Sequence, residues 1–475
     1  RQPKEKEPSN TSVELPPELC SIIMSPISIA TFYSFSFVPS IMHRIESLLI
    51  AVNLKKMLAD DCMQKVLEAI TTKKCQEKID LESLETLGDS FLKYATGQWL
   101  FKTCQNDLKG SLSFKRDKMI SNSALCEHGC DHNLPGFIRD ETFDPKMWII
   151  PGDQSINYSL DEELLSTTRK VYNRGRRKVE SKKVADVVEA LIGAFISSTG
   201  SRLAALSFMN WVGIKVDNIL YKSHIPVPPD IHVDIKNLES LLKYSFHDHS
   251  LLEEALTHGS WKRPNYQRLE FLGDSVLDYL ITMHLYRPGM KPELLTNLRS
   301  ASVNNECYAL SAVKAGLHEY ILHKSQELKD LIAVAVLHVE QLRFVTTFGW
   351  EWEATYPKVL GDIIESVAGA IFIDSGYNEE IVFKKIGALL EPMITPETLK
   401  LHPVIELKEL CENRPYKKKE HVVCRDDGTA SVTVEVIDAN GVKHERSCIE
   451  GNIDMAKKLA SRAVLKSLKE SMPST

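Results

Sequence analysis

Apolar residues recur at three- and four-residue spacing along most of the chain, which is the period of an amphipathic helix. The segments RIESLLIAVNLKKML (44–58) and NLESLLKYSF (237–246) are typical of this pattern. The two-residue alternation that indicates a strand is scarce before residue 420. The pattern therefore predicts an all-helical protein up to that region.

A different pattern begins near His402. Residues 402–415 have the helical period, residues 417–451 alternate between Val-rich and polar positions around a predicted turn at 438–441, and residues 452–470 return to the helical period. These segments predict a small module with the order α-β-β-β-α. The predicted fold class is therefore mainly α, with this module at the end.

Four blocks of sequence occur twice in the same order, which indicates two tandem copies of one all-helical domain. The spacing between the blocks differs in the two copies, so the copies share helices and differ in loop length, unlike a solenoid of short repeats. The paired blocks are 67–71 with 253–257, 84–94 with 269–279, 115–122 with 298–305, and 186–200 with 362–376.

Each copy carries two pairs of acids at helical spacing. Residues three or four apart share one face of a helix, so each pair directs two carboxylates to one point. The acids stand among apolar residues, and a buried anion requires protonation, a basic partner or a metal ion. The acids are Glu85, Asp89, Asp186 and Glu189 in the first copy, and Glu270, Asp274, Asp362 and Glu365 in the second.

If the two helices of one copy face each other, their four carboxylates form an all-oxygen nest, which suits Mg²⁺ or Mn²⁺ better than zinc. Such a nest holds two ions about 4 Å apart, an arrangement that activates a water molecule and stabilises the leaving oxygen in phosphodiester hydrolysis. The alternative is that these acids are surface or capping charges of the helices. Their recurrence in both copies, among apolar residues, favours the metal site.

Composition limits the partners and the compartment. No run approaches the roughly 20 consecutive apolar residues of a membrane span, so we expect no membrane partner. The ten cysteines are scattered, which indicates reduced thiols and a nuclear setting, with the cytoplasm as the alternative. Cys126, His128, Cys130 and His132 are crowded together, whereas zinc sites draw ligand pairs from separated segments, so we expect buried thiols there.

The formal net charge of −6 opposes binding of a polyanion over the whole surface, but it leaves room for a segregated basic patch. Residues 167–183 are dense in Lys and Arg and contain a single acid, Glu180. A solvated loop and a phosphate-binding segment both fit this composition. The candidate RNA-binding residues here are Arg174, Arg176, Arg177 and Lys178.

The repeated blocks resemble the two signature motifs of the ribonuclease III family, and two copies followed by an α-β-β-β-α module resemble the C-terminal half of Dicer. The segments SIMHRIESLLIAVNLK (40–55) and PKVLGDIIESVAGA (357–370) are similar to plant Dicer-like enzymes, in particular the third Dicer-like class. The resemblance divides the chain into 1–39, the tail of an end-binding PAZ-like domain with its connector; 40–222 and 223–398, two ribonuclease III domains; and 399–475, a double-stranded-RNA-binding domain.

The resemblance implies a monomer in which the two ribonuclease III domains form an intramolecular pseudo-dimer. It assigns metal ligation and catalysis to the eight acids, with two Mg²⁺ or Mn²⁺ ions at each site. Each site would cut one strand of double-stranded RNA, giving small interfering RNAs with 5′-phosphates and short 3′ overhangs for RNA silencing. A double-stranded-RNA-binding protein is a candidate partner.

The resemblance also identifies departures and residues without a settled role. A further family acid matches Glu82 in the first copy and Gln267 in the second, so we assign it no catalytic role. The final module has Ser461 where the family is usually basic. Its candidate RNA-binding residues are Lys457, Lys458 and Arg462. Two roles are open for four further polar residues: they could support the nests or reach phosphates, or they could pack between helices. These residues are Arg116, Asn122, Arg299 and Asn305.

Two other functions fit part of the pattern. A Drosha-like RNA-processing enzyme shares the tandem layout and the RNA-binding module. A catalytically inactive scaffold that binds double-stranded RNA would have lost some of the acids, and none of the eight is lost here.

Overall fold

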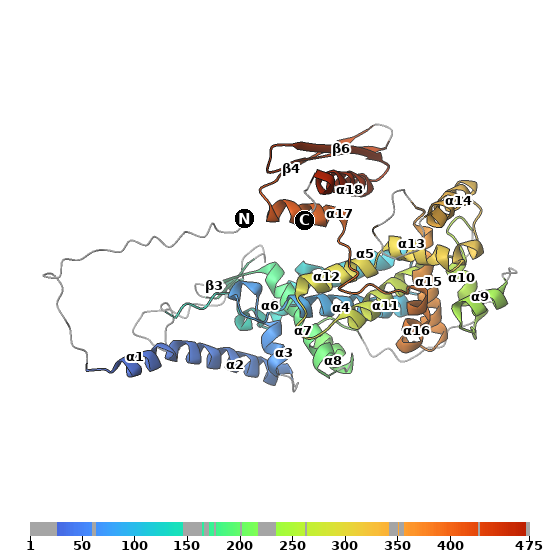
Figure 1. Ribbon diagram of the computed structural model, residues 1–475. Helices are drawn as coiled ribbons and strands as arrows, with labels where there is room; N and C mark the ends of the chain where they lie inside the picture. The colour runs from blue at the N-terminus through green and yellow to red at the C-terminus, as the bar shows by residue number, and fades with distance from the viewer. Residues whose placement is uncertain are drawn as a thin grey trace.

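The computed structural model is mainly helical, with two small antiparallel sheets (Figure 1). The predicted fold class is therefore confirmed. The structure describes residues 26–58, 63–145, 164–165, 171–174, 177–199, 202–216, 234–261, 264–341, 350, 356–425 and 428–471.

The first helical domain is built around α4 and α7, which pack side by side, with α3 and α6 against α7. A small antiparallel sheet with the order β1-β2-β3 precedes α7, and the helical pattern did not predict it. The elements are α1 Ile29–Ser36, α2 Val38–Leu58, α3 Met63–Ala69, η2 Lys73–Cys75, α4 Glu82–Thr103, α5 Lys109–Ile120, α6 Asn122–Asp131, η3 Leu134–Phe137, β1 Leu164–Leu165, β2 Val171–Arg174, β3 Arg177–Glu180, α7 Ser181–Thr199 and α8 Arg202–Val212.

The second helical domain repeats this plan, since α11 packs on α15 as α4 packs on α7. An isolated bridge from Thr257 to Leu322 in the second domain also repeats one from Thr71 to Arg139 in the first. The elements are α9 Ile235–Leu242, α10 His249–Leu256, α11 Gln267–Leu285, α12 Pro292–Ser302, α13 Asn305–Lys314, η4 Leu317–Tyr320, α14 Gln326–Gln341, α15 Val359–Asp374 and α16 Glu379–Leu389.

Glycines allow the central helices of each domain to approach closely. A Cβ atom on Gly88 would lie 1.8 Å from the backbone oxygen of Glu189, and one on Gly193 would lie 2.1 Å from that of Leu84. In the second domain, a Cβ atom on Gly273 would lie 1.7 Å from the backbone oxygen of Glu365. Only glycine fits such contacts, because a real Cβ atom would overlap the neighbouring backbone. This close crossing sets the distance between the acids of the two helices.

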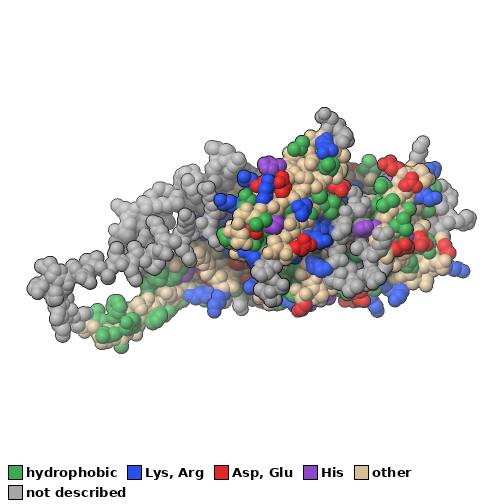
Figure 2. All heavy atoms as spheres, turned by 45° about the horizontal axis from the view of Figure 1, so that its top comes forward, with side chains coloured by type: hydrophobic (Ala, Val, Ile, Leu, Met, Phe, Trp, Pro, Cys, Tyr) green, Lys and Arg blue, Asp and Glu red, His purple; other side chains and the backbone are tan. Residues whose placement is uncertain are grey.

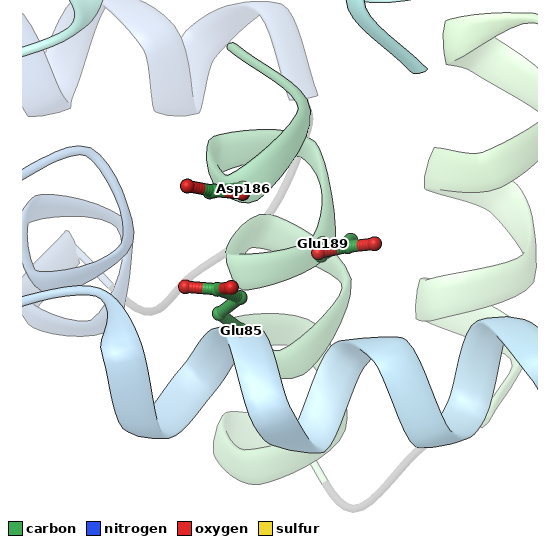
Figure 3. Close-up of side chains that lie close together, drawn as sticks. All are labelled: Glu85, Asp186 and Glu189. Atoms are coloured by element: carbon green, nitrogen blue, oxygen red, sulfur yellow. The ribbon is translucent and has the colours of Figure 1, made fainter. Parts of the chain in front are cut away.

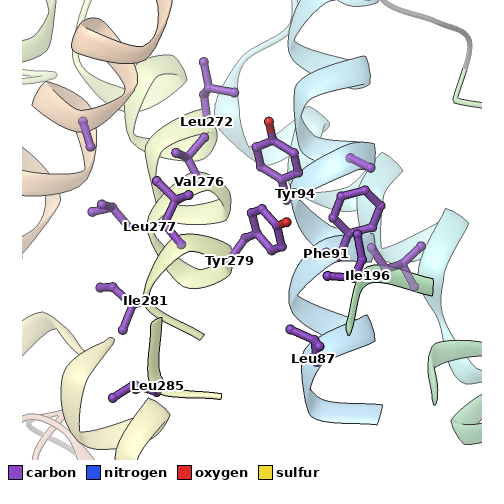
Figure 4. Close-up of a cluster of buried hydrophobic side chains, with 14 of the residues drawn as sticks. Leu87, Phe91, Tyr94, Ile196, Leu272, Val276, Leu277, Tyr279, Ile281 and Leu285 are labelled. Carbon is purple, nitrogen blue, oxygen red and sulfur yellow. The ribbon is translucent and has the colours of Figure 1, made fainter. Parts of the chain in front are cut away.

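The two domains join through α4 and α11, which lie side by side at the centre of the molecule (Figure 1). Tyr94 on α4 stacks on Tyr279 of α11 with ring centroids 4.8 Å apart, and Phe91 lies edge-on to Tyr279 at 5.3 Å (Figure 4). Buried aromatic pairs of this kind contribute strongly to an interface. Arg268 of α11 donates to the backbone oxygens of Phe101 and Cys104 in the first domain. The predicted intramolecular pseudo-dimer is confirmed.

The C-terminal module has the predicted order α-β-β-β-α. Its elements are α17 Pro403–Asn413, β4 Lys417–Cys424, β5 Ala430–Ile437, β6 Lys443–Glu450 and α18 Ile453–Ser471. The antiparallel sheet has the order β4-β5-β6, and α17 and α18 pack together. Val432, Val434 and Val436 of β5 are buried with Ala460 and Val464 of α18. These small and β-branched residues form the core of the module.

The helices α1 and α2 carry exposed apolar side chains, among them Phe32 and Phe35, which are 65% and 66% exposed. Figure 2 shows hydrophobic side chains gathered at this end of the molecule. By length and composition alone, residues 29–56 could cross a membrane, whereas we expected no such segment. Arg44 and Glu46 lie within it, and charged side chains are costly in the hydrocarbon of a bilayer. A single helix of this kind is weak support for a membrane span.

The described cysteines form no disulfide. Cys126 and Cys130 of α6 are buried in the core of the first domain, with their sulfur atoms 3.9 Å apart. The expected buried thiols are therefore confirmed.

Candidate functional site

The four acids of the first copy lie where α4 crosses α7, and we call them the first nest. Glu85 of α4 and Asp186 and Glu189 of α7 each place one carboxylate oxygen within 4.8 Å of the others (Figure 3). Asp89 lies one turn beyond Glu85 on α4, and its charge acts on Glu189. The structure thus brings three of the four acids selected by the helical spacing within reach of one cation, with Asp89 close enough for its charge to act on Glu189.

The first nest is costly to ionise without a cation. Burial, with the charge of Asp186, raises the pKa of Glu85 to about 7. Burial, with the charges of Asp89 and Glu85, raises the pKa of Glu189 to about 8. Burial also raises the pKa of Asp186, although Lys182 opposes this. A nest of carboxylates that resists ionisation, and offers only oxygen ligands, fits a hard divalent cation.

The second nest consists of Glu270, Asp274, Asp362 and Glu365. Glu270 of α11 and Asp362 and Glu365 of α15 again place one carboxylate oxygen each within 4.8 Å of the others. Burial, followed by the charge of Glu270, raises the pKa of Asp362 to about 6. Burial and the charge of Asp274 raise the pKa of Glu365 well above its usual value. The second nest therefore fits a divalent cation for the same reasons as the first.

Each domain supplies an arginine to the nest of the other domain. Arg299 of α12 donates from both terminal nitrogens to Asp89 of the first nest at 3.1 Å, and it also binds Asp278. Arg116 of α5 approaches Asp274 of the second nest at 3.6 Å. Of the two open roles for these arginines, the structure therefore favours support of the nests.

Sequence reasoning missed the lysines of the nests. Lys182 binds Asp186 at 2.9 Å, and Lys358 binds Glu270 at 2.9 Å and also contacts Asp362. Comparison of the repeats could have found both, because each lysine stands four residues before the first acid of its pair. Two other lysines contact the nests: Lys93 binds Asp89, and Lys109 binds Glu270. Neither has a lysine at the equivalent position of the other domain.

A family model described as the ribonuclease III domain matches residues 82–200 and 267–376. Each match contains all four acids of one nest. The chain belongs to the ribonuclease III family. It carries two ribonuclease III domains, each containing one nest.

The chain is similar to plant Dicer homologues over nearly its whole length. It is 55% identical to Endoribonuclease Dicer homolog 2 of Arabidopsis thaliana over 482 residues, which cover 99% of this chain and 34% of that protein. It is 45% identical to Dicer homolog 2b of Oryza sativa subsp. japonica over 494 residues, covering 98% and 34%. It is 36% identical to Dicer homolog 3 of Arabidopsis thaliana over 471 residues, covering 91% and 29%.

These relatives confirm the Dicer-like resemblance. They do not support the third Dicer-like class, because the identity to Dicer homolog 2 is higher than that to Dicer homolog 3 from the same plant. The chain spans about a third of the length of the Dicer homologues it matches.

The position of the further family acid differs between the two ribonuclease III domains. Glu82 is held by Lys73 at 3.2 Å, and Lys73 also contacts Glu293 of the second domain at 3.3 Å. These residues line an open cleft that leads to Glu85 of the first nest. The equivalent position in the second domain is the neutral Gln267. The first nest therefore has an additional acidic rim.

The basic residues of the C-terminal module lie differently from the prediction. The helix α18 begins at Ile453, in agreement with the helical period predicted for residues 452–470, and Lys457 binds Glu420 within the module at 2.7 Å. Lys458 is 2% exposed and contacts Glu306 of the second ribonuclease III domain, while Arg462 contacts the backbone oxygen of Trp350. Lys458 and Arg462 therefore connect the module to the second domain, and binding of RNA by Lys457, Lys458 and Arg462 stays a prediction.

The basic segment before α7 is described only in part. Arg174 ends β2, and Arg177 and Lys178 lie in β3, while Arg176 lies outside the described residues. Binding of RNA by these residues stays a prediction. Asn122 is exposed at the start of α6, and Asn305 packs beside Gly361 at the start of α13, so both lie on helix ends.

Proposed function

We propose that this chain hydrolyses double-stranded RNA, with each nest cutting one strand. The observation that carries the proposal is the duplication of the carboxylate nest within one chain. The strands of a duplex are antiparallel, so two sites related by an approximate two-fold arrangement can present the same chemistry to both strands. Because α4 and α11 pack directly on each other, the offset between the two cuts is fixed by the protein.

The nests are the proposed sites of Mg²⁺ or Mn²⁺. Bound there, divalent ions would supply Lewis acidity for attack of water on the phosphodiester and charge stabilisation for the leaving oxygen. Glu85, Asp186 and Glu189 would hold them in the first nest, and Glu270, Asp362 and Glu365 in the second. Asp89 and Asp274, each contacted by an arginine of the other domain, complete the two ligand sets.

The products follow from this geometry and from the relatives. A fixed offset between the two cuts would leave short 3′ overhangs, and attack of water with the 3′ oxygen leaving gives 5′-phosphate ends. The high identity to proteins named Dicer homologues supports small interfering RNAs and RNA silencing as the product and pathway, over a Drosha-like role. The retention of all eight acids supports an active enzyme over an inactive scaffold.

Further parts of the proposal concern partners and location. The C-terminal module has the order expected of a double-stranded-RNA-binding domain, which reads the shape of A-form RNA. We propose double-stranded RNA as the main partner, a double-stranded-RNA-binding protein as a second partner, a monomeric state and a nuclear location.

The test compares the chain with Asp89→Ala, Asp274→Ala and the double variant on a duplex RNA whose strands carry different end labels, in Mg²⁺. Each single change should reduce cutting of one strand at least about a hundredfold, a different strand in each case, because each removes a ligand from one nest. The double change should stop both cuts without loss of duplex binding. Asp117→Ala, an exposed acid of α5, is the matched control and should cut both strands.

The proposal fails if Asp89→Ala and Asp274→Ala affect the same strand. It also fails if the unaltered chain binds the duplex in Mg²⁺ and leaves both strands whole.

A further inference from the structure

The second nest contains a cation that comes from the other domain. Lys109 is the first residue of α5 in the first ribonuclease III domain, and its ammonium group donates to a carboxylate oxygen of Glu270. Lys358 donates to the same oxygen at 2.9 Å. Glu270 is 1% exposed. Two ammonium groups therefore share one buried carboxylate, which is the central ligand that α11 provides to the second nest.

The first nest lacks this arrangement. Among the described residues, no Lys or Arg nitrogen lies within 4.0 Å of a carboxylate oxygen of Glu85, which is the equivalent of Glu270. Lys182, the equivalent of Lys358, reaches Asp186 instead. The repeat places Pro292 of α12 opposite Lys109, and Glu293 follows it and lines the cleft of the first nest. At the position where the second nest has a lysine, the first nest thus has a proline, followed by an acid that lines its cleft.

The position of Lys109 is not explained by the stability of its own helix. The N-terminus of a helix carries partial positive charge, which favours acids in the first turn and disfavours lysine. The first turn of α12 follows this preference with Glu293, whereas α5 has no acid in its first turn. The ion pair with Glu270 offsets the unfavourable interaction of Lys109 with the helix N-terminus. The role of this lysine is therefore in the second nest and not in its own helix. The neutral Gln267 nearby removes a further negative charge from this site.

We propose that Lys109 takes the place of one divalent cation in the second nest, so that this nest binds one ion where the first nest binds two. The inference rests on the proposed function, because it assumes that the nests bind divalent cations. An ammonium group fixed beside Glu270 supplies one positive charge and N–H donors to anionic oxygens. A divalent ion at the same oxygen would be repelled by it at close range. The two strands are then cut with different dependence on metal concentration.

The test uses the full chain with the first nest disabled by Glu85→Gln and Asp186→Asn, and Mn²⁺ as the probe. Isothermal titration calorimetry and electron paramagnetic resonance count the bound ions without RNA. This chain should bind one Mn²⁺ in the second nest. Adding Lys109→Ala should either create a second Mn²⁺ site or tighten binding about tenfold or more, because one nearby positive charge is removed.

Three further variants test whether the charge of Lys109 causes the change in Mn²⁺ binding. Lys109→Arg keeps the charge and should keep a single ion, while Lys109→Gln should behave as the alanine variant does if that variant folds poorly. Lys115→Ala is the matched control, since Lys115 lies on the same helix and binds Asp107 at 2.6 Å. It should leave Mn²⁺ binding unchanged.

The number and affinity of bound ions decide the outcome. If Mn²⁺ still binds, and both quantities are the same with and without Lys109, the inference is overturned and the proposed function stands. If the unaltered chain and every variant fail to bind Mn²⁺, the proposed function is overturned, and the inference with it.

Discussion

The two nests hold the same four acids in the same arrangement and differ in what surrounds them. In the first nest, Asp89 is held by Lys93 and Arg299, while Glu85 has no cation within 4.0 Å among the described residues. In the second nest, the cations gather on Glu270. The carboxylates are fixed by the crossing of two helices within each domain, whereas the cations come partly from the opposite domain. Duplication has therefore conserved the ligands and changed their electrostatic setting.

The largest expected effect concerns the glycines that allow the helices to cross. Gly273→Val should disrupt the second nest, and Gly88→Val the first, because the new Cβ would overlap the backbone of Glu365 or Glu189. We expect each change to cost about 3 kcal/mol or more of unfolding free energy. Thermal unfolding measures this loss, and Gly387→Ala in α16, where a Cβ meets nothing within 4 Å, is the control. Equal melting temperatures for the valine and control variants would contradict the close crossing.

A smaller effect distinguishes the two arginines that cross between domains. Arg299 binds both Asp89 and Asp278, so Arg299→Ala leaves two acids without this partner, whereas Arg116 only approaches the half-exposed Asp274. We expect Arg299→Ala to cost about 2 kcal/mol and Arg116→Ala less than about 1 kcal/mol. Urea unfolding of the two variants tests the order. An equal or greater loss of unfolding free energy in Arg116→Ala would contradict the expectation that Arg299 makes the stronger cross-domain contact.

The smallest effect is the pH dependence of the metal-free chain. The raised pKa values, about 7 for Glu85, about 8 for Glu189 and about 6 for Asp362, mean that the folded state holds protons that the unfolded state has released. Stability should therefore fall by roughly 1–2 kcal/mol as pH rises from about 5 to about 8. Asp362 of the second nest should contribute at the lower end of this window, and Glu85 and Glu189 of the first nest at the upper end.

Melting temperatures measured in a chelator across this window test the pH dependence. Mg²⁺ should restore stability most at the high-pH end, where the carboxylates are ionised and bind it best. A stability that rises with pH in the chelator, or that Mg²⁺ leaves unchanged, would contradict the raised pKa values or their link to the metal.

The parts of the site that sequence predicted are those set by local spacing. Glu85 and Asp89 share a face because they are four residues apart on one helix, and the repeat marked the same face in the second domain. The pairing of Lys109 with Glu270 joins residues 161 positions apart in different domains, so no local period indicates it. Burial of Lys458 against Glu306 is equally non-local, which is why a surface role was predicted for that lysine.

The short sheet β1-β2-β3 was not predicted, for a different reason. Its strands are two to four residues long, which is too short for an alternation of apolar and polar positions to be recognised. The three strands of the C-terminal module are eight residues each, and their alternation was clear.

Both carboxylate nests should bind divalent cations. The most direct measurement is a crystal structure of the chain grown with Mn²⁺, with anomalous diffraction used to locate the ions. We expect anomalous peaks between Glu85, Asp186 and Glu189 and between Glu270, Asp362 and Glu365. Peaks at neither nest, in crystals where both nests are open to solvent, would contradict it.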